Sequence, residues 1–164
     1  MKIDELKFVR LNQPGQFDLI PPKLLEQVKG NSLDDTERLR EFGRMVIINP
    51  LAFIYVLVDP TSKIQGLLWF ELSIMSATFH IRLLSLDKKY QDKKVKPGSD
   101  NIMSRAVKFV AGLRPSIEKR YNFKTKPVIL AESTRPRYCE KYLKAKRCKS
   151  VSIEIPIGDD NGTG

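Results

Sequence analysis

The sequence predicts an α/β domain built on one mixed sheet. Three apolar stretches rich in β-branched and aromatic residues, at 52–58, 64–74 and 78–86, follow one another with only short turns between them. This spacing predicts three antiparallel strands in a row. Beyond residue 100 helical and strand patterns alternate, which predicts a β-α-β crossover and a parallel strand pair. The expected element order is β-α-α-β-β-β-α-β-α-β.

The first half of the chain is expected to begin with one strand and two helices. The strand spans 2–11, with KFVRL as its core. A short helix follows Pro22 and ends at Gly30, and Ser32 is placed to cap the next helix. Pro50 stops that second helix, because the residue before a proline disfavours the helical conformation.

The second half is expected to complete the sheet within a single domain spanning 1–157. A polar, glycine-rich tail over 158–164 is predicted to be flexible. The other expected elements are a helix starting near Ile102 and interrupted at Arg114-Pro115 with a further turn to Arg120, a strand over 127–133, a helix over 135–147 and a strand over 150–157.

The distribution of charge along the chain points to an anionic partner. The formal net charge is +10, and residues 1–86 carry 10 Lys/Arg against 10 Asp/Glu, so the excess lies in residues 87–164. Such one-sided basicity fits a nucleic acid, an acidic protein or a phosphorylated cofactor. A solubilising surface is the alternative.

The sequence holds few signals of export or metal binding. No apolar run approaches the roughly 18 residues that span a bilayer, and the N-terminus does not resemble a secretory signal. We therefore expect a cytoplasmic protein. Two cysteines at a spacing of nine and one histidine predict no metal site and two reduced thiols.

The segment between the third of these strands and the following helix has the features of a phosphate site. Five lysines fall within residues 88–96, and Pro97-Gly98-Ser99 then opens a helical pattern. A strand, a basic loop and a helix start together offer ammonium groups and unpaired amides to an anion.

Two short stretches, taken with the element order, resemble the GNAT (Gcn5-related N-acetyltransferase) family. LDKKYQ at 86–91 has the shape of the family's Val-x-Pro-x-Tyr-Arg pattern, which precedes two loop glycines. KYLKAKR at 141–147 stands where the family often reads Leu-Tyr-Glu-Lys-x-Gly-Phe, and an alternating strand follows it. The resemblance covers about residues 1–157.

This resemblance implies that acetyl-CoA lies between the fourth and fifth strands, with its pyrophosphate held by the loop and the helix start. Lys94 and Lys96 stand where the family has glycines, so charge replaces part of the backbone recognition. The residues implied to bind the cofactor are Leu84, Ser85, Leu86, Gln91, Lys93, Lys94, Lys96, Gly98 and Ser99.

The resemblance also suggests the catalytic groups. Tyr142 occupies the place of the family's acid, which protonates the leaving thiolate, and Tyr138 is the second choice. Glu71 and Glu132 are the candidate bases, and His80 suits a base by its ordinary pKa. No metal is expected.

Two functions remain open at this stage. The first is an acyl-CoA-dependent N-acetyltransferase that acetylates an amine of unknown identity. The second is a catalytically inactive GNAT-fold binding or structural protein, of the kind found in phages or viruses and then virion-associated. Its basic second half, with seven Lys/Arg against one acid in residues 135–149, would contact nucleic acid or another anion. The oligomeric state is not predicted, although the family often forms dimers.

Overall fold

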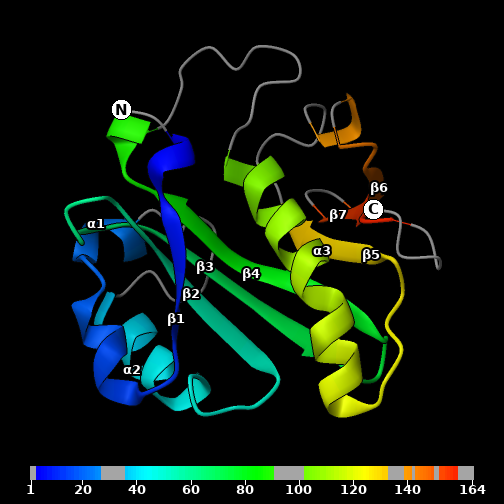
Figure 1. Ribbon diagram of the computed structural model, residues 1–164, viewed down its shortest axis with the longest axis horizontal. Coiled ribbons are helices and arrows are strands. Elements are labelled where there is room, and N and C mark those ends of the chain that lie inside the picture. Colours follow the sequence, from blue (N-terminus) through cyan, green and yellow to red (C-terminus); the bar gives the residue numbers. More distant parts are fainter. Residues whose placement is uncertain are drawn as a thin grey trace. The chain divides into compact units, whose positions relative to one another are not determined.

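The computed structural model describes residues 3–26, 36–90, 102–132, 139–141, 143–149 and 152–158. Apart from short 3-10 turns, the elements in Figure 1 follow the predicted order along the chain as far as residue 132. The α-helices are α1 (Pro22–Leu25), α2 (Thr36–Val46) and α3 (Ile102–Tyr121). The strands are β1 (Lys7–Leu11), β2 (Ala52–Val58), β3 (Ile64–Ser73), β4 (Thr78–Leu86), β5 (Val128–Glu132), β6 (Lys146–Lys149) and β7 (Ser152–Pro156). Three 3-10 turns are η1 (Ile3–Glu5), η2 (Pro14–Leu19) and η3 (Lys88–Tyr90).

The strands described here form a seven-stranded mixed sheet in the order β1-β2-β3-β4-β5-β7-β6. The chain separates into two compact units: unit 1 holds residues 1–71 and 83–93, and unit 2 holds residues 72–82 and 94–164. That one domain spans 1–157 stays a prediction.

Unit 1 is an antiparallel meander covered by helical segments. β1 pairs with β2 from Lys7↔Val58 to Leu11↔Ile54, and β2 pairs with β3 from Ala52↔Glu71 onward. The first six residues of β2 are buried on both faces, which explains its unbroken apolar sequence. The core of the unit joins η2, α1 and α2 to one face of the strands, with these residues buried: Leu11, Phe17, Ile20, Leu24, Leu25, Leu39, Ile47, Ile54, Val56, Leu67, Trp69 and Leu83.

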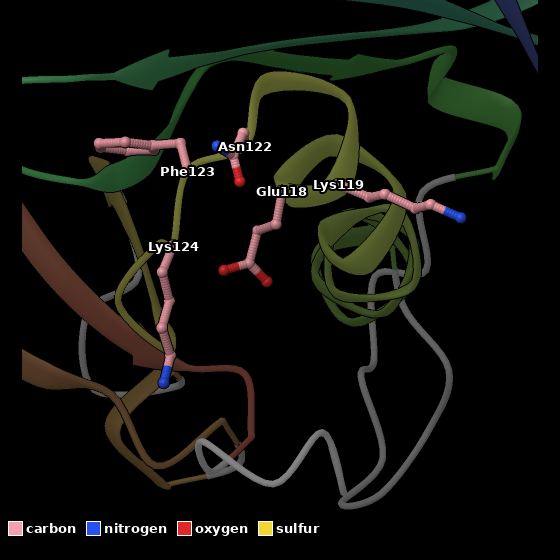
Figure 2. Close-up of a pocket in the computed structure, with 5 residues that line it drawn as sticks. All are labelled: Glu118, Lys119, Asn122, Phe123 and Lys124. Carbon is pink, nitrogen blue, oxygen red and sulfur yellow. The ribbon is translucent and has the colours of Figure 1, made fainter.

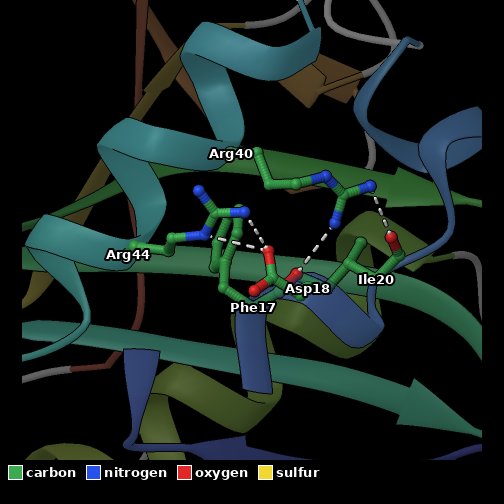
Figure 3. A network of polar contacts seen from close by, with 5 residues as sticks. All are labelled: Phe17, Asp18, Ile20, Arg40 and Arg44. Atoms are coloured by element: carbon green, nitrogen blue, oxygen red, sulfur yellow. Dashed lines mark hydrogen bonds and ion pairs between the residues drawn. The ribbon is translucent and has the colours of Figure 1, made fainter. Parts of the chain in front are cut away.

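α2 is fixed to η2 by a close approach and by two arginines (Figure 3). Gly43 of α2 lies against the ring of Phe17, and a Cβ at position 43 would overlap that ring. Arg40 is 8% exposed and donates from its guanidinium to the carbonyl oxygens of Phe17 at 3.2 Å and Ile20 at 3.0 Å. Arg44, one turn later, pairs with the exposed carboxylate of Asp18.

Unit 2 contains α3 and the strands that complete the sheet. β4 pairs with β5 in parallel from Phe79↔Ile129 to Ile81↔Ala131, which confirms the predicted crossover. β5 pairs antiparallel with β7, and β7 with β6. Arg114 of α3 is buried and holds the loop before β5, because it donates to the hydroxyl and the carbonyl oxygen of Thr125, each at 2.9 Å.

Two expected features of the second half are wrong. The helix expected over 135–147 does not reach its predicted end: residues 139–141 are helical, Lys144 has a left-handed φ of 54°, and Lys146–Lys149 form β6. The open edge of β7 supplies the main-chain partners that draw these residues into a strand. In addition, α3 continues through Pro115 rather than breaking there.

Candidate functional site

The carboxyl end of β4 is the part of the predicted cofactor site that the structure describes. Ser85 and Leu86 are buried in the strand, and Leu84 is half-buried. Among the residues that the structure describes, the buried Ser85 Oγ has no hydrogen-bond partner. Such an atom ordinarily has a partner, so its environment is suited to a water molecule or a ligand. The other residues predicted to bind the cofactor, Gln91, Lys93, Lys94, Lys96, Gly98 and Ser99, lie outside the described residues.

Asp87 follows β4 directly, and its carboxylate has two partners at this end of unit 1. Its residue is 8% exposed, and its carboxylate forms a close ion pair with the ammonium of Lys23 on α1. The carboxylate also accepts from the amide of Lys89 at 3.1 Å. The hydrogen bond from Lys23 and then that from the Lys89 amide lower the pKa of Asp87, against the opposing effect of burial. Asp87 is therefore held as a carboxylate and is a poor proton acceptor.

Gln65 on β3 links Asp87 to a second carboxylate. The amide of Asp87 donates to the carbonyl oxygen of Gln65 at 2.7 Å, so the two residues lie opposite each other on neighbouring strands. Gln65 is 3% exposed, and its Nε2 donates to Asp59 Oδ2 at 2.7 Å. Its Oε1 is buried and has no partner within the described ranges.

Asp59 also organises the turn between β2 and β3. Its Oδ1 accepts from the hydroxyl and the amide of Thr61 and from the amide of Lys63. The bond from the Thr61 hydroxyl, followed by that from the Lys63 amide, holds the pKa of Asp59 well below its usual range.

Tyr90 in η3 completes a group that we name the β4-exit cluster: Lys23, Asp59, Gln65, Asp87 and Tyr90. The amide of Tyr90 donates to the carbonyl oxygen of Asp87 at 2.9 Å. Burial raises the pKa of the Tyr90 hydroxyl, and the nearby carboxylates of Asp59, Glu5 and Asp87 raise it further. Figure 1 accordingly draws η3 beside η1, which contains Glu5.

Among the predicted catalytic residues, the structure describes the side chains of Glu71 and His80. Glu71, at the far end of β3, is half-buried and accepts from Trp69 Nε1 at 3.2 Å. It is six residues from Gln65, or about 20 Å along an extended strand, and so lies far from the β4-exit cluster. Glu132 ends β5 opposite Ser152, but its side chain is outside the described part of the chain, as are Tyr142 and Tyr138. His80, half-buried on β4, pairs in register with Leu130. The catalytic roles stay predictions.

A separate hollow of about 490 Å³ lies at the carboxyl end of α3 in unit 2 (Figure 2). Glu118, Lys119, Asn122, Phe123 and Lys124 line it. The Glu118 carboxylate is already engaged, since it accepts from the Thr125 amide at 2.7 Å and pairs with Arg114 at 3.4 Å. In Figure 2 the Lys119 side chain extends away from the other four. None of the predicted site residues lines this hollow.

Most of the β4-exit cluster could not be predicted from the sequence. Lys23 and Asp87 are 64 residues apart, so no local pattern could have paired them. Gln65 alone could have indicated a polar site from the sequence, and only weakly, because it is a polar residue near the start of a largely apolar strand. Asp59-Pro60-Thr61 was correctly identified as a turn, but its carboxylate was not assigned to a site.

Comparison with known proteins gives likenesses in structure alone. No protein-family model matches the chain, and no curated protein matches it in sequence. A chimera of the Vibrio cholerae spermidine N-acetyltransferase SpeG and hSSAT matches with a TM-score of 0.57 and 12% identity, covering 93% of this chain and 96% of the other. Mutant forms of the same Vibrio cholerae enzyme, called a spermidine/spermine N-acetyltransferase, match with a TM-score of 0.57 and 13% identity, covering 93% and 91%. A dodecameric structure of that enzyme matches with a TM-score of 0.55 and 12% identity, also covering 93% and 91%.

The chain therefore has the fold of the GNAT N-acetyltransferases, as the sequence predicted. The likeness extends over nearly the whole chain, and the element order and the parallel β4–β5 pair agree with it. Within the described ranges, no helix combines the length and the apolar character needed to cross a membrane.

Proposed function

We propose that this chain is an acyl-CoA-dependent N-acetyltransferase that transfers an acetyl group to an amine. The observation that carries the proposal is the GNAT fold, matched over 93% of the chain by structures of spermidine N-acetyltransferases. Fold alone does not define a reaction, so the residues must also be able to bind the cofactor.

The residues at the end of β4 are compatible with acetyl-CoA. Ser85 Oγ offers a buried hydroxyl that has no partner in the described part of the chain, on the strand where the family binds the cofactor. Lys93, Lys94 and Lys96 supply ammonium groups for its phosphates, as point charges rather than a backbone cradle. Bound acetyl-CoA supplies the acetyl group as a thioester.

Calorimetry with acetyl-CoA tests the binding step. We expect saturable heat and a rise in melting temperature for the native chain, because a ligand that binds only the folded state stabilises it. Replacing Lys94 and Lys96 together by glutamine should weaken binding about tenfold or more, since charge-assisted hydrogen bonds contribute about 1.5–3 kcal/mol. Lys108→Gln, which removes an exposed lysine of α3 outside the loop, is the matched control. Absence of heat and of any thermal shift at millimolar acetyl-CoA would refute the proposal.

Release of free CoA thiol in the presence of a set of amines then tests the chemistry. Steady thiol release that depends on the amine supports transfer, and release that is equal without amine indicates hydrolysis alone. The acceptor is proposed to be an amine, as the spermidine N-acetyltransferases act on spermidine.

An inactive binding protein is the second candidate, because many exposed lysines and arginines lie on unit 2. These include Lys108, Lys119, Arg120, Lys124, Lys126, Lys141, Lys144 and Lys146. Gel-shift titrations with nucleic acid at several salt concentrations separate the two candidates. Binding that falls steeply with salt, in a chain that does not bind acetyl-CoA, favours this alternative.

A further inference from the structure

The turn between β3 and β4, in unit 2, carries two exposed apolar side chains that we name the apolar tip: Ile74 and Met75. The amide of Ala77 donates to the carbonyl oxygen of Ile74 at 3.3 Å, which makes Met75 and Ser76 the two central residues of the turn. Met75 is 100% exposed and Ile74 is 57% exposed. Central turn positions are ordinarily taken by glycine, proline, asparagine, aspartate or serine, each for a conformational reason. A methionine at this position therefore exposes apolar surface that the turn itself does not require.

The main chain of the apolar tip is held in one conformation. Ser76 Oγ is hydrogen-bonded to Thr78 Oγ1 at 2.5 Å, and Ala77 closes the turn with a left-handed φ of 55°. A surface segment that is already ordered loses little conformational entropy when a partner binds it.

A basic surface lies next to this turn. The amide of Lys126 donates to the carbonyl oxygen of Ala77 at 2.7 Å, so the segment after α3 and the turn lie side by side. Residues 118–126 contain four cationic side chains, all exposed, and one acid, and residues 72–82 contain no acid. We name the four cations the basic segment: Lys119, Arg120, Lys124 and Lys126.

The single acid of this stretch does not neutralise the basic segment. Glu118 accepts from the Thr125 amide at 2.7 Å and pairs with the buried Arg114 at 3.4 Å. Lys119 and Arg120 also suit the carboxyl end of α3, where the helix dipole favours cations. Lys124 lies beyond the helix, as does Lys126, so the dipole does not account for these two lysines.

An apolar tip beside a basic surface has the chemistry of a protein that binds anionic lipids. Lipid phosphates attract lysine and arginine near the bilayer surface, and the acyl boundary below them accepts apolar side chains. A nucleic acid offers phosphates but no hydrocarbon for Met75. Figure 2 shows the side chains of Lys119 and Lys124 extending in different directions, so the cations are spread over a surface. A compact anion would contact only part of them, whereas a layer of headgroups contacts them all.

We propose that this end of unit 2 binds the surface of an anionic bilayer, with the apolar tip inserted among the headgroups and the basic segment on the lipid phosphates. The association is peripheral and reversible, because a short apolar insertion combined with a basic patch binds far more weakly than a spanning helix. The proposal goes beyond acetyl transfer and does not depend on it.

Co-sedimentation of the full chain with vesicles tests the proposal. One set of vesicles contains phosphatidylcholine alone, and the other contains equal parts of phosphatidylcholine and phosphatidylglycerol. We expect binding to the anionic vesicles to be at least about 10-fold tighter, since each cation near an anionic surface contributes about 5-fold. Sodium chloride should weaken this binding because it screens the lipid charge.

Two variants separate the apolar and the charged contributions. Met75→Ser should weaken binding to the anionic vesicles about 10-fold, because it removes most of the inserted apolar surface. Lys124→Gln/Lys126→Gln should weaken it about 25-fold, or about 5-fold for each charge. All three side chains are exposed, so both variants should keep the native melting temperature.

Unit 1 offers a matched control for each variant. Met45→Ser removes another exposed methionine, which is 71% exposed on α2 and stands four residues after Glu41. Lys7→Gln/Lys63→Gln removes two exposed lysines and gives the same net charge as the double variant of the basic segment. Both controls should bind the anionic vesicles as tightly as the native chain.

Insertion of the apolar tip has a readout of its own. Met75→Trp places an indole at the tip, whereas Trp69, the tryptophan of the native sequence, is only 2% exposed. Tryptophan is favoured at bilayer interfaces, so this variant should bind more tightly than the native chain. Anionic lipids with brominated acyl chains should quench its fluorescence and leave the fluorescence of the native chain unchanged.

Three results would overturn the proposal. The first is no sedimentation of the native chain with anionic vesicles. The second is an equal loss of binding in the basic-segment variant and in its lysine control, because net charge alone would then account for binding. The third is vesicle binding that Met75→Ser leaves unchanged, together with gel shifts of duplex DNA that Lys124→Gln/Lys126→Gln abolishes, which would assign the surface to nucleic acid. None of these measurements uses acetyl-CoA or an amine, so their outcome is independent of the proposed acetyl transfer.

Discussion

Two arginines one turn apart on α2 provide a sharp test of the energetics of unit 1. Arg40 is 8% exposed and donates to two main-chain carbonyl oxygens, whereas Arg44 pairs with Asp18 on the surface, where the two side chains are 40% and 44% exposed. The same substitution, Arg→Met, keeps an unbranched apolar stem at each site and removes only the guanidinium. The two variants differ mainly in the environment of the lost group.

The decrease in the free energy of unfolding that we expect for Arg40→Met follows from the hydrogen bonds of the Arg40 guanidinium. Each bond to a charged donor contributes about 1.5–3 kcal/mol, and its removal leaves the carbonyl oxygens of Phe17 and Ile20 without that donor. Relief of the desolvated guanidinium offsets part of this loss, so we expect a net destabilisation of about 2–4 kcal/mol. For Arg44→Met we expect a much smaller effect, which disappears at high salt because exposed ion pairs are screened.

Urea denaturation followed by far-ultraviolet circular dichroism measures the difference. The slope of the transition should stay constant in both variants, so that a change of midpoint reports stability. Arg40→Met should lower the midpoint in low and high salt alike. Equal shifts of the urea midpoint in the two variants would show that the buried contacts with the carbonyl oxygens do not stabilise the packing of α2 on η2. A midpoint shift of Arg40→Met that depends on salt would show the same.

Three further outcomes test other parts of the structure. Gly43→Ala should destabilise by about 1–3 kcal/mol in thermal unfolding, because overlap with the Phe17 ring outweighs the gain of about 1 kcal/mol that alanine ordinarily brings to a helix. Asp59 has a lowered pKa, so its stabilisation is present above the usual carboxyl value of about 3.9 and is lost as pH falls through the folded value; Asp59→Asn should flatten the acid limb of a stability–pH curve. Arg114→Met should cost about 2–4 kcal/mol in urea denaturation, and Thr125→Val, which removes only the bond to the hydroxyl, about 1 kcal/mol.

Much of the fold could be predicted because strand and helix periodicity are local properties. The strand expected over 78–86 is β4 without change, and the strands expected at 52–58 and 64–74 differ from β2 and β3 by at most one residue. The prediction failed at 146–149, where lysines typical of a helix surface form β6. Lysine is also common on edge strands, where its charge discourages further pairing, so composition could not distinguish the two.

The candidate site was predictable only in outline. The basic loop expected after β4 and the tendency of GNAT cofactors to bind there placed Ser85 and Leu86 in the predicted set. The structure shows that both residues are buried in β4. The β4-exit cluster was not predicted, because its members are dispersed along the sequence. Glu71 stays a candidate base, which the structure describes as a half-buried residue of β3.

The sequence by itself determined the order of strands and helices and the concentration of positive charge after residue 86, because both depend on neighbours along the chain. Only the tertiary structure decided that Lys23 meets Asp87, that Gln65 donates to Asp59, and that Arg40 holds η2. These contacts depend on which faces and ends of the elements come together, and burial then gives them their strength. The same aspartate that belongs to a loop motif in the sequence becomes, through packing, the buried partner of Lys23.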